Sequence, residues 1–338
     1  MRPIAVVILN WNGADMLQRF LPSVVSSVGQ LATVYVADNA SDDASASVVS
    51  SAFPQVGWLP LDRNYGFAGG YNRALQRVAE PYLLLLNSDV EVSPDWLQPL
   101  YEYMEAHPET AACQPKIRSQ RNKPLFEYAG AAGGFIDCLG YPFCRGRLMS
   151  SVERDEGQYD TTVSVFWATG AALLIRRTDF FSVGGFDERF FAHMEEIDLC
   201  WRLRSRGRGV ACVPRSVVYH VGAATLKKES PHKTFLNFRN NLLMLYKNLP
   251  DGELHRVLRW RRLLDYVALF KFFLTGHWRN ACAVRRARAE FRRLLPEFQA
   301  SRAENLRKAL PGAIPERVPF SLLFRYYVLR QTRYSRLR

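Results

Sequence analysis

Residues 83–92 read LLLLNSDVEV, and this stretch decides the fold class of the chain. Four leucines in succession are typical of a strand that is buried on both faces, as in parallel sheets covered by helices. The run then ends in Asn87, Ser88 and Asp89 before the apolar pattern returns. Polar groups at the end of such a strand lie at the edge where open α/β sheets bind ligands. The stretch therefore predicts a buried strand with a ligand site at its carboxyl end.

The segments on either side alternate between strand and helix patterns. Short β-rich runs cover 4–9, 33–37, 56–61 and 82–86, and helical spacing covers 15–28, 43–52 and 66–79. This β-α-β-α order predicts an α/β domain whose mainly parallel sheet is covered on both faces. The length of 338 residues and the hydrophobic content of 48% allow one large domain with an appendage.

Polar residues follow three of the predicted strands. They are Asn10 and Asn12 after the first strand, Asp38 after the second, and Asn87 to Asp89 after the fourth. Each set alone is typical of a turn or a helix cap. Three sets at one edge of a sheet indicate a ligand site instead.

A glycine-rich segment, NYGFAGGYN, covers residues 64–72 after the third strand. Glycines let the backbone approach a phosphate or a ribose before a helix begins, so this segment is a candidate nucleotide contact. The spacing is not GxGxxG, which argues against a dinucleotide site, and a plain turn stays open as the alternative.

The net charge of +13 lies entirely in the last quarter of the chain. Residues 1–250 hold 25 basic and 25 acidic residues, whereas residues 251–338 hold 20 basic and 7 acidic residues. Pro250 is therefore the predicted boundary between a neutral domain (1–250) and a basic C-terminal region (251–338). The six cysteines form no CxxC pair, and the N-terminus has no secretion-signal pattern. We therefore expect reduced thiols and a cytoplasmic protein.

Six motifs carry a resemblance to a known family. They are VVILNWNG, VADNASDD, NYGFAGGYN, LLLLNSDVEV, the block ATGAALLIRRTDFFSVGGFDERFFAHMEEIDLCWRLRSRG, and YHVGAAT. In this order they resemble a family 2 glycosyltransferase of the rhamnosyltransferase-like branch over roughly residues 3–249. The resemblance implies a GT-A fold and an inverting, metal-dependent sugar transfer, with rhamnose as one candidate sugar, in bacterial surface polysaccharide synthesis. It also implies a dTDP- or UDP-linked sugar donor and a glycan or polyprenyl-diphosphate-linked acceptor.

The resemblance also implies roles for residues at the strand ends. Asp89 and His220 would hold Mg²⁺ or Mn²⁺, which neutralises a leaving diphosphate. The family's usual Asp-x-Asp pattern is here Asn87-Ser88-Asp89, so it supplies one carboxylate. Without the resemblance, a lone histidine after an apolar strand is more often a packed or capping residue.

Asp38 matches the family's aspartate that accepts a hydrogen bond from the N3–H of uracil or thymine. A turn residue at a strand end is the plain alternative. The other expected contacts of the nucleotide sugar are Asn10, Asn12, Arg63, Asn64, Gly70, Asn87 and Ser88.

The stretch HMEEID at 193–198 contains the candidate base. A sugar transfer of this kind needs a base that takes the proton of the acceptor hydroxyl. The resemblance assigns this catalytic role to Glu196, where the family has an aspartate, and Glu195 stays open as the alternative. Asp187, in the preceding glycine loop, is a further candidate for contact with the sugar. Thr169, Gly170 and Asp198 are the expected acceptor-binding residues, although packing and a favourable helix dipole explain such residues as well.

The basic region contains an apolar stretch at 263–274 that is too short and too charged to span a bilayer. Together with arginine-rich segments such as VRRARAEFRR at 284–293, it suits a peripheral position on an anionic membrane at the cytoplasmic face. A helical cap packed on the catalytic domain is the alternative, and a homo-oligomer stays open. No nucleic-acid recognition motif accompanies the arginines. Asn87 and Glu196 also leave open a nucleotide-sugar-binding protein that has lost catalysis.

Overall fold

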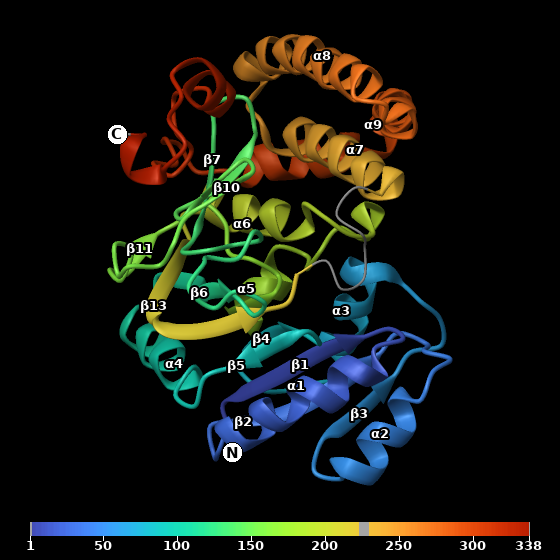
Figure 1. Ribbon diagram of the computed structural model, residues 1–338, viewed down its shortest axis with the longest axis vertical. Helices are drawn as coiled ribbons and strands as arrows, with labels where there is room; N and C mark the ends of the chain where they lie inside the picture. Colours follow the sequence, from blue (N-terminus) through green and yellow to red (C-terminus); the bar gives the residue numbers. More distant parts are fainter. Residues whose placement is uncertain (1, 223–229, 338) are drawn as a thin grey trace.

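The computed structural model describes residues 2–222 and 230–337, so the last three residues of the YHVGAAT motif lie outside the described part of the chain. A large mixed sheet with helices on both faces forms the centre of the molecule (Figure 1). Within the described residues its strands follow the order β11-β13-β6-β12-β4-β1-β2-β3, with β5 paired to β13. A smaller sheet has the order β10-β9-β8-β7.

The strands are β1 (Ile4–Asn10), β2 (Ala32–Asp38), β3 (Gly57–Pro60), β4 (Tyr82–Asn87), β5 (Val90–Val92), β6 (Thr110–Ser119), β7 (Gly134–Ile136), β8 (Pro142–Cys144), β9 (Arg147–Leu148), β10 (Ser151–Val152), β11 (Val163–Ser164), β12 (Ala172–Arg176) and β13 (Gly209–His220). The helices are α1 (Ala14–Ser27), α2 (Ser45–Ala52), α3 (Gly66–Gln76), α4 (Leu97–Ala106), α5 (Arg177–Ser182), α6 (Glu195–Ser205), α7 (Pro231–Asn248), α8 (Asp251–Leu274) and α9 (Trp278–Lys308). Short helical turns occur at Glu188–Phe190, Phe324–Val328 and Tyr334–Arg336.

The first half of the sheet is parallel, as the β-α-β-α pattern predicts. β1 pairs with β2 and β4, and β2 pairs with β3, all in parallel. The register sets Asn10 beside Asp38 and Leu9 beside Asn87. The polar ends of the first, second and fourth strands therefore meet at one edge of the sheet, as predicted.

The second half contains antiparallel strands. β12 lies antiparallel between β4 and β6, and the long strand β13 runs parallel to β6 with a register shift between Val213 and Val217. Beyond that shift β13 pairs with β5, which sets His220 beside Val90. This pairing brings the end of β13 to the turn that carries Asp89.

Alternate side chains of β1 enter two separate apolar cores. Ile4, Val6 and Ile8 pack in the core that contains the buried residues of α1 and α4. Ala5 and Val7 pack in the core on the other face, which contains α3 and α6. Burial on both faces explains why the central strands are continuous apolar runs.

Helices α7, α8 and α9 stack at the end of the molecule opposite α1 and α2, and α8 forms the outer edge (Figure 1). Pro250 lies at the break between α7 and α8. Phe291 and Phe298 of α9 nevertheless belong to the same core cluster as Leu242 and Leu245 of α7. The basic C-terminal region is therefore packed against the rest of the chain. None of the described helices is both long and apolar enough to cross a bilayer.

Candidate active site

Asn10 and Asp38 are neighbours at the ends of β1 and β2. Asn10 is fully buried, and its Nδ2 donates to Asp38 Oδ1 (3.0 Å) and to Ser45 Oγ (2.9 Å). Asp38 Oδ2 also accepts the backbone N–H of Ser41 (3.0 Å). The pair fixes the loop that follows β2, and contact of Asp38 with a nucleobase stays a prediction.

Asparagines tie the neighbouring loops together. Asn12 Oδ1 accepts the N–H of Asp42 (3.0 Å). Asn39, which sequence reasoning missed, donates from Nδ2 to Asn64 Oδ1 (3.0 Å) and accepts the N–H of Tyr65 at Oδ1 (2.9 Å). These bonds hold the segment before α3 against the end of β2, so the predicted nucleotide contacts Asn12 and Asn64 lie at the same edge as Asp38.

Arg63 and Gly70 belong to the same segment but differ in exposure. The Arg63 guanidinium lies 4.7 Å from the centre of the Tyr65 ring on the exposed side. Gly70 lies inside α3, where an added Cβ would come within 2.8 Å of Leu9 Cδ1. Gly70 therefore lets α3 approach β1, and its contact with the nucleotide sugar stays a prediction.

Asp89, His220 and Glu127 form a buried row of charged groups. His220 Nε2 lies 3.1 Å from Asp89 Oδ1, and His220 Nδ1 lies 3.5 Å from Glu127 Oε2. Asn87 Nδ2 lies 3.4 Å from the same Nε2. All three charged side chains are less than 10% exposed. The sequence predicted Asp89, Asn87 and His220 here, and the structure adds Glu127.

The donor set fits a hard divalent cation. Two atoms that bind one Mg²⁺ or Mn²⁺ stand roughly 3 Å apart, which is the separation of Asp89 Oδ1 and His220 Nε2. A carboxylate on the far nitrogen of a metal-binding histidine, as Glu127 is placed, orients the ring and raises its basicity. Across residues 2–222 and 230–337, no three His, Cys, Asp or Glu side chains are gathered as a complete shell. Further ligands would have to come from phosphate oxygens and water.

The local potential is strongly negative. Burial lowers the pKa of His220, but the carboxylates of Asp89 and Glu127 outweigh burial and raise the pKa to about 10. Burial raises the pKa of Asp89, yet the charge of His220 brings it below the usual value. Sites that retain a proton this strongly are electrostatically suited to a cation in its place.

Glu195 and Glu196 open helix α6, and each has one buried carboxyl oxygen, Oε2, without a hydrogen bond among the described residues. Burial raises the pKa of Glu196 to about 7, and burial together with the charge of Glu196 raises the pKa of Glu195 well above its usual value. A carboxyl group with a pKa near neutrality is suited to accept a proton at cellular pH. Glu195 is only 4% exposed, whereas Glu196 is half-buried.

Glu196 faces the chain that leads into β12. An added Cβ at Gly170 would lie 3.9 Å from Glu196 Cβ, and the next residue, Ala171, accepts the N–H of Asn87 (3.0 Å). The acidic start of α6 and the Asn87–Asp89 turn therefore flank the same short segment. Thr169 is itself buried, with its N–H bonded to Gln114 Oε1 (2.9 Å), so it shapes this segment from inside.

Residues 5–180, more than half of the chain, match the family model described as glycosyl transferase family 2. The chain belongs to this family. It is a glycosyltransferase, as the resemblance predicted. A Mycobacterium tuberculosis relative, N-acetylglucosaminyl-diphospho-decaprenol L-rhamnosyltransferase, is 28% identical over 276 residues, covering 76% of this chain and 88% of its own. The Escherichia coli rhamnosyltransferase WbbL is 29% identical over 46% of this chain and 61% of its own.

Solved structures of other glycosyltransferases share the fold. GalNAc-T7 in complex with UDP, GalNAc and Mn²⁺ has a TM-score of 0.58 at 18% identity, over 72% of this chain and 48% of that chain. The Pyrobaculum calidifontis mannosyltransferase PcManGT, in complex with GDP-Man and Mn²⁺, has a TM-score of 0.53 at 14% identity, over 90% of this chain and 84% of that chain. These likenesses confirm the predicted GT-A fold.

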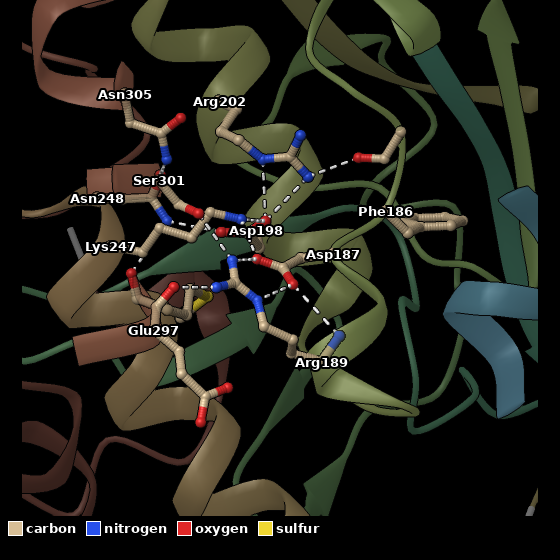
Figure 2. A network of polar contacts seen from close by, with 12 residues as sticks. Phe186, Asp187, Arg189, Asp198, Arg202, Lys247, Asn248, Glu297, Ser301 and Asn305 are labelled. Atoms are coloured by element: carbon tan, nitrogen blue, oxygen red, sulfur yellow. Dashed lines mark hydrogen bonds and ion pairs between the residues drawn. The ribbon is translucent and has the colours of Figure 1, made fainter. Parts of the chain in front are cut away.

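In this family 2 glycosyltransferase, Asp187 and Asp198 belong to a buried ion network (Figure 2). Lys247 Nζ of α7 lies 2.8 Å from Asp187 Oδ2 and 2.8 Å from Asp198 Oδ2. Arg189 also binds Asp187, and together these cations hold the pKa of that carboxyl below its usual range despite burial. Both cations bind Asp187, so the predicted contact of Asp187 with the sugar would have to displace Arg189 or Lys247.

Asp198, a predicted acceptor-binding residue, is held by side chains of α6 and α7. It is fully buried, its Oδ1 accepts from Asn248 Nδ2 (2.8 Å), and its Oδ2 accepts from Arg202 Nε (2.9 Å) and Lys247. Its predicted contact with an acceptor stays a prediction, and the carboxylate would have to leave these partners to make it. Asp198 instead links α6 to α7, and Asn305 of α9 extends the link through Asn248 (3.0 Å).

The turn before Glu195 is strained and is held by α7. Phe191, His193 and Met194 all have positive φ angles, of 66°, 71° and 73°. Such conformations cost about 1–3 kcal/mol each in non-glycine residues and persist where the surroundings determine them. Asn240 Nδ2 contacts the carbonyl oxygens of Phe190 (2.9 Å), Ala192 (2.9 Å) and His193 (2.8 Å).

Sequence reasoning missed Glu127, Asn240 and Lys247, which act only through contacts made in the folded chain. Each stands in a segment without a recognisable motif: Glu127 lies in a loop, and the other two lie in an ordinary helix pattern. The one sequence signal for Glu127 was the isolated histidine of VVYH, because a buried histidine needs polar partners.

Proposed function

We propose that this glycosyltransferase performs an inverting, metal-dependent transfer of a sugar, with rhamnose as the leading candidate, from a dTDP- or UDP-linked donor. The observation that carries the proposal is the 3.1 Å approach of His220 Nε2 to Asp89 Oδ1 at the ligand edge of the sheet. The Mn²⁺ in the solved structures of GalNAc-T7 and PcManGT supports a divalent ion. Mg²⁺ or Mn²⁺ are the candidate metals.

Asp89 and His220 would hold the metal next to the donor diphosphate. The bound ion would supply charge neutralisation for the leaving diphosphate. Glu127 keeps the His220 ring in orientation, and Asn87 replaces a second carboxylate with a neutral amide. One carboxylate fewer leaves more of the metal's charge for the phosphates. Asn10, Asp38, Asn12, Asn64 and Ser88 are the proposed contacts for the rest of the nucleotide sugar.

Glu196 is the proposed base. An inverting transfer needs one carboxylate that takes the proton of the acceptor hydroxyl while the hydroxyl attacks from the side opposite the leaving group. Its half-buried position, its pKa of about 7 and its place beside Gly170 support this role. Glu195 is more deeply buried and is the second candidate.

A lipid-linked acceptor is proposed because the Mycobacterium tuberculosis relative carries a diphospho-decaprenol substrate in its name. The chain would then build a bacterial surface polysaccharide from the cytoplasmic face of a membrane. The excess positive charge of residues 251–338 supports an anionic membrane surface as a partner.

The test is the release of nucleoside diphosphate from a panel of dTDP-, UDP- and GDP-linked sugars, with Mg²⁺, with Mn²⁺ and with a chelator. The proposal expects release with one dTDP- or UDP-sugar that depends on the metal. Binding of a donor without any release, with every acceptor and metal, would instead favour a nucleotide-sugar-binding protein that has lost catalysis.

A further inference from the structure

Large apolar side chains are exposed along one face of α8. Trp260, Leu263, Val267, Phe270 and Leu274 are each 53–67% exposed. They are spaced by three or four residues, so they form one stripe along the helix. Tyr266 and Phe273 widen this stripe. We call these seven residues the α8 stripe.

The buried face of α8 carries two charged residues besides the apolar Leu254 and Val257. Arg261 and Asp265 are fully or almost fully buried, and Asp265 binds Arg288 of α9 (2.5 Å). An amphipathic helix on a water-facing surface has the opposite arrangement, with apolar residues inside and charges outside. A contiguous apolar patch of this kind marks a surface that is covered in the working protein.

The charges around the α8 stripe are all positive. Between 254 and 279, a range described throughout, the single acidic side chain is the buried Asp265. The exposed charged residues of this range are Arg256, Arg259, Arg262, Lys271 and Arg279. An apolar stripe with aromatic residues and a cationic border matches the interface of a bilayer that contains anionic lipids.

A second exposed segment extends the same surface. Phe324, Tyr327, Val328 and Leu329 are 46–61% exposed. Lys271 Nζ lies 5.9 Å from the centre of the Tyr327 ring, which places this segment against the end of α8 that carries the stripe. The apolar surface is therefore built from two elements that are far apart in the sequence.

We propose that the α8 stripe, with residues 324–329 beside it, inserts into the headgroup region of an anionic membrane while α8 lies parallel to the bilayer. The proposal rests on the proposed membrane partner and names the surface that makes the contact. Helices α7 and α9 lie between α8 and the large sheet (Figure 1). In this orientation they separate the ligand edge of the sheet from the bilayer surface.

The test measures binding of the full chain to vesicles of phosphatidylcholine alone and of phosphatidylcholine with phosphatidylglycerol. The Leu263→Glu and Phe270→Glu variants should each reduce binding to the mixed vesicles by about tenfold or more. Each replaces an apolar side chain that the bilayer would bury with a charged one. Leu310→Glu is the matched control, since it makes the same charge change at an apolar residue that is 60% exposed elsewhere. It should bind as the wild type does.

Trp260 lies in the α8 stripe and reports its insertion, because the emission of this side chain should shift to the blue with mixed vesicles and be quenched by brominated lipid. Donor turnover in solution should be unchanged in Phe270→Glu, which separates this proposal from the proposed catalysis. Equal binding by all variants, no binding by the wild type, or no blue shift would overturn the proposal. A wild-type dimer that Phe270→Glu converts to monomer would also overturn it, since the stripe would then be an interface between two copies of the chain.

Discussion

His220 Nε2 lies 3.1 Å from Asp89 Oδ1 although 131 positions separate the two residues in the chain numbering. The antiparallel pairing of β13 with β5 creates this contact, because it sets His220 beside Val90. The only carboxylate of the Asn87-Ser88-Asp89 turn thereby gains a histidine nitrogen as its neighbour. The proposed metal site depends on this pair.

Replacing Asp89 with Ala should abolish the Mn²⁺-dependent part of nucleotide binding, because the remaining His220 has no negative charge to offset the charge of the ion. His220→Ala should weaken the same response less. Isothermal titration with UDP or dTDP, with and without Mn²⁺, measures both. Asp95→Ala removes an exposed carboxylate six positions further on and serves as the control. Metal dependence that survives in Asp89→Ala would remove Asp89 from the site.

Replacing Glu127 with Gln should weaken Mn²⁺ binding by about 10- to 100-fold, the usual effect of losing a carboxylate that orients a metal-binding histidine. The amide keeps the size of the side chain, so the fold should persist. Glu102→Gln, at an exposed position, should leave Mn²⁺ binding unchanged. The role of Glu127 would be refuted by wild-type Mn²⁺ affinity in the variant.

Replacing Glu196 with Gln should lower turnover by roughly 10²-fold or more while donor affinity stays near normal, because the base is lost and the shape is kept. Glu195→Gln should retain most of the turnover. A base whose pKa is about 7 works only when deprotonated, so wild-type turnover should rise from about pH 6 to about pH 8. If the two variants exchange these profiles, Glu195 is the base.

Replacing Lys247 with Met should lower the free energy of unfolding by about 3 kcal/mol, because two buried carboxylates lose a shared cation. Denaturant unfolding at neutral pH measures the change. Lys308→Met breaks an exposed pair with Glu304 and should have little effect. Similar stability of both variants would mean that Arg189 and Arg202 compensate the two aspartates without Lys247.

The sequence predicts the parallel half of the fold well because that half is built from local signals. Runs such as the leucines before Asn87 are long, apolar and followed by polar turns, and the predicted strands match β1 to β4 closely. The antiparallel pairing of β12 and the bent strand β13 depend on contacts between distant segments. No local pattern encodes such contacts, so the position of His220 beside Asp89 came from the resemblance alone.

The site is predicted unevenly for the same reason. Asp89 and Asn10 follow apolar strand patterns, so the sequence alone places them at the ligand edge of the sheet. Glu127 and Lys247 act through contacts from a loop and a distant helix, which spacing does not reveal. The ion pair of Asp198 with Lys247 was not predicted, because an acid in the first turn of a helix has the same sequence pattern whether it faces solvent or a buried lysine. The sequence predicts the apolar stretch at 263–274, but the exposure of the α8 stripe depends on the burial of Arg261 and Asp265, which no local pattern reveals.

We propose that sugar transfer requires a metal ion bound at Asp89. The most direct measurement is release of nucleoside diphosphate from the preferred donor, in the presence of acceptor, by wild type, Asp89→Ala and Asp95→Ala, each with Mn²⁺ and with a chelator. We expect metal-dependent release by wild type and Asp95→Ala, and a loss of roughly 10²-fold or more in Asp89→Ala that added metal does not restore. Release by the wild type that is unaffected by the chelator and by Asp89→Ala would contradict this proposal.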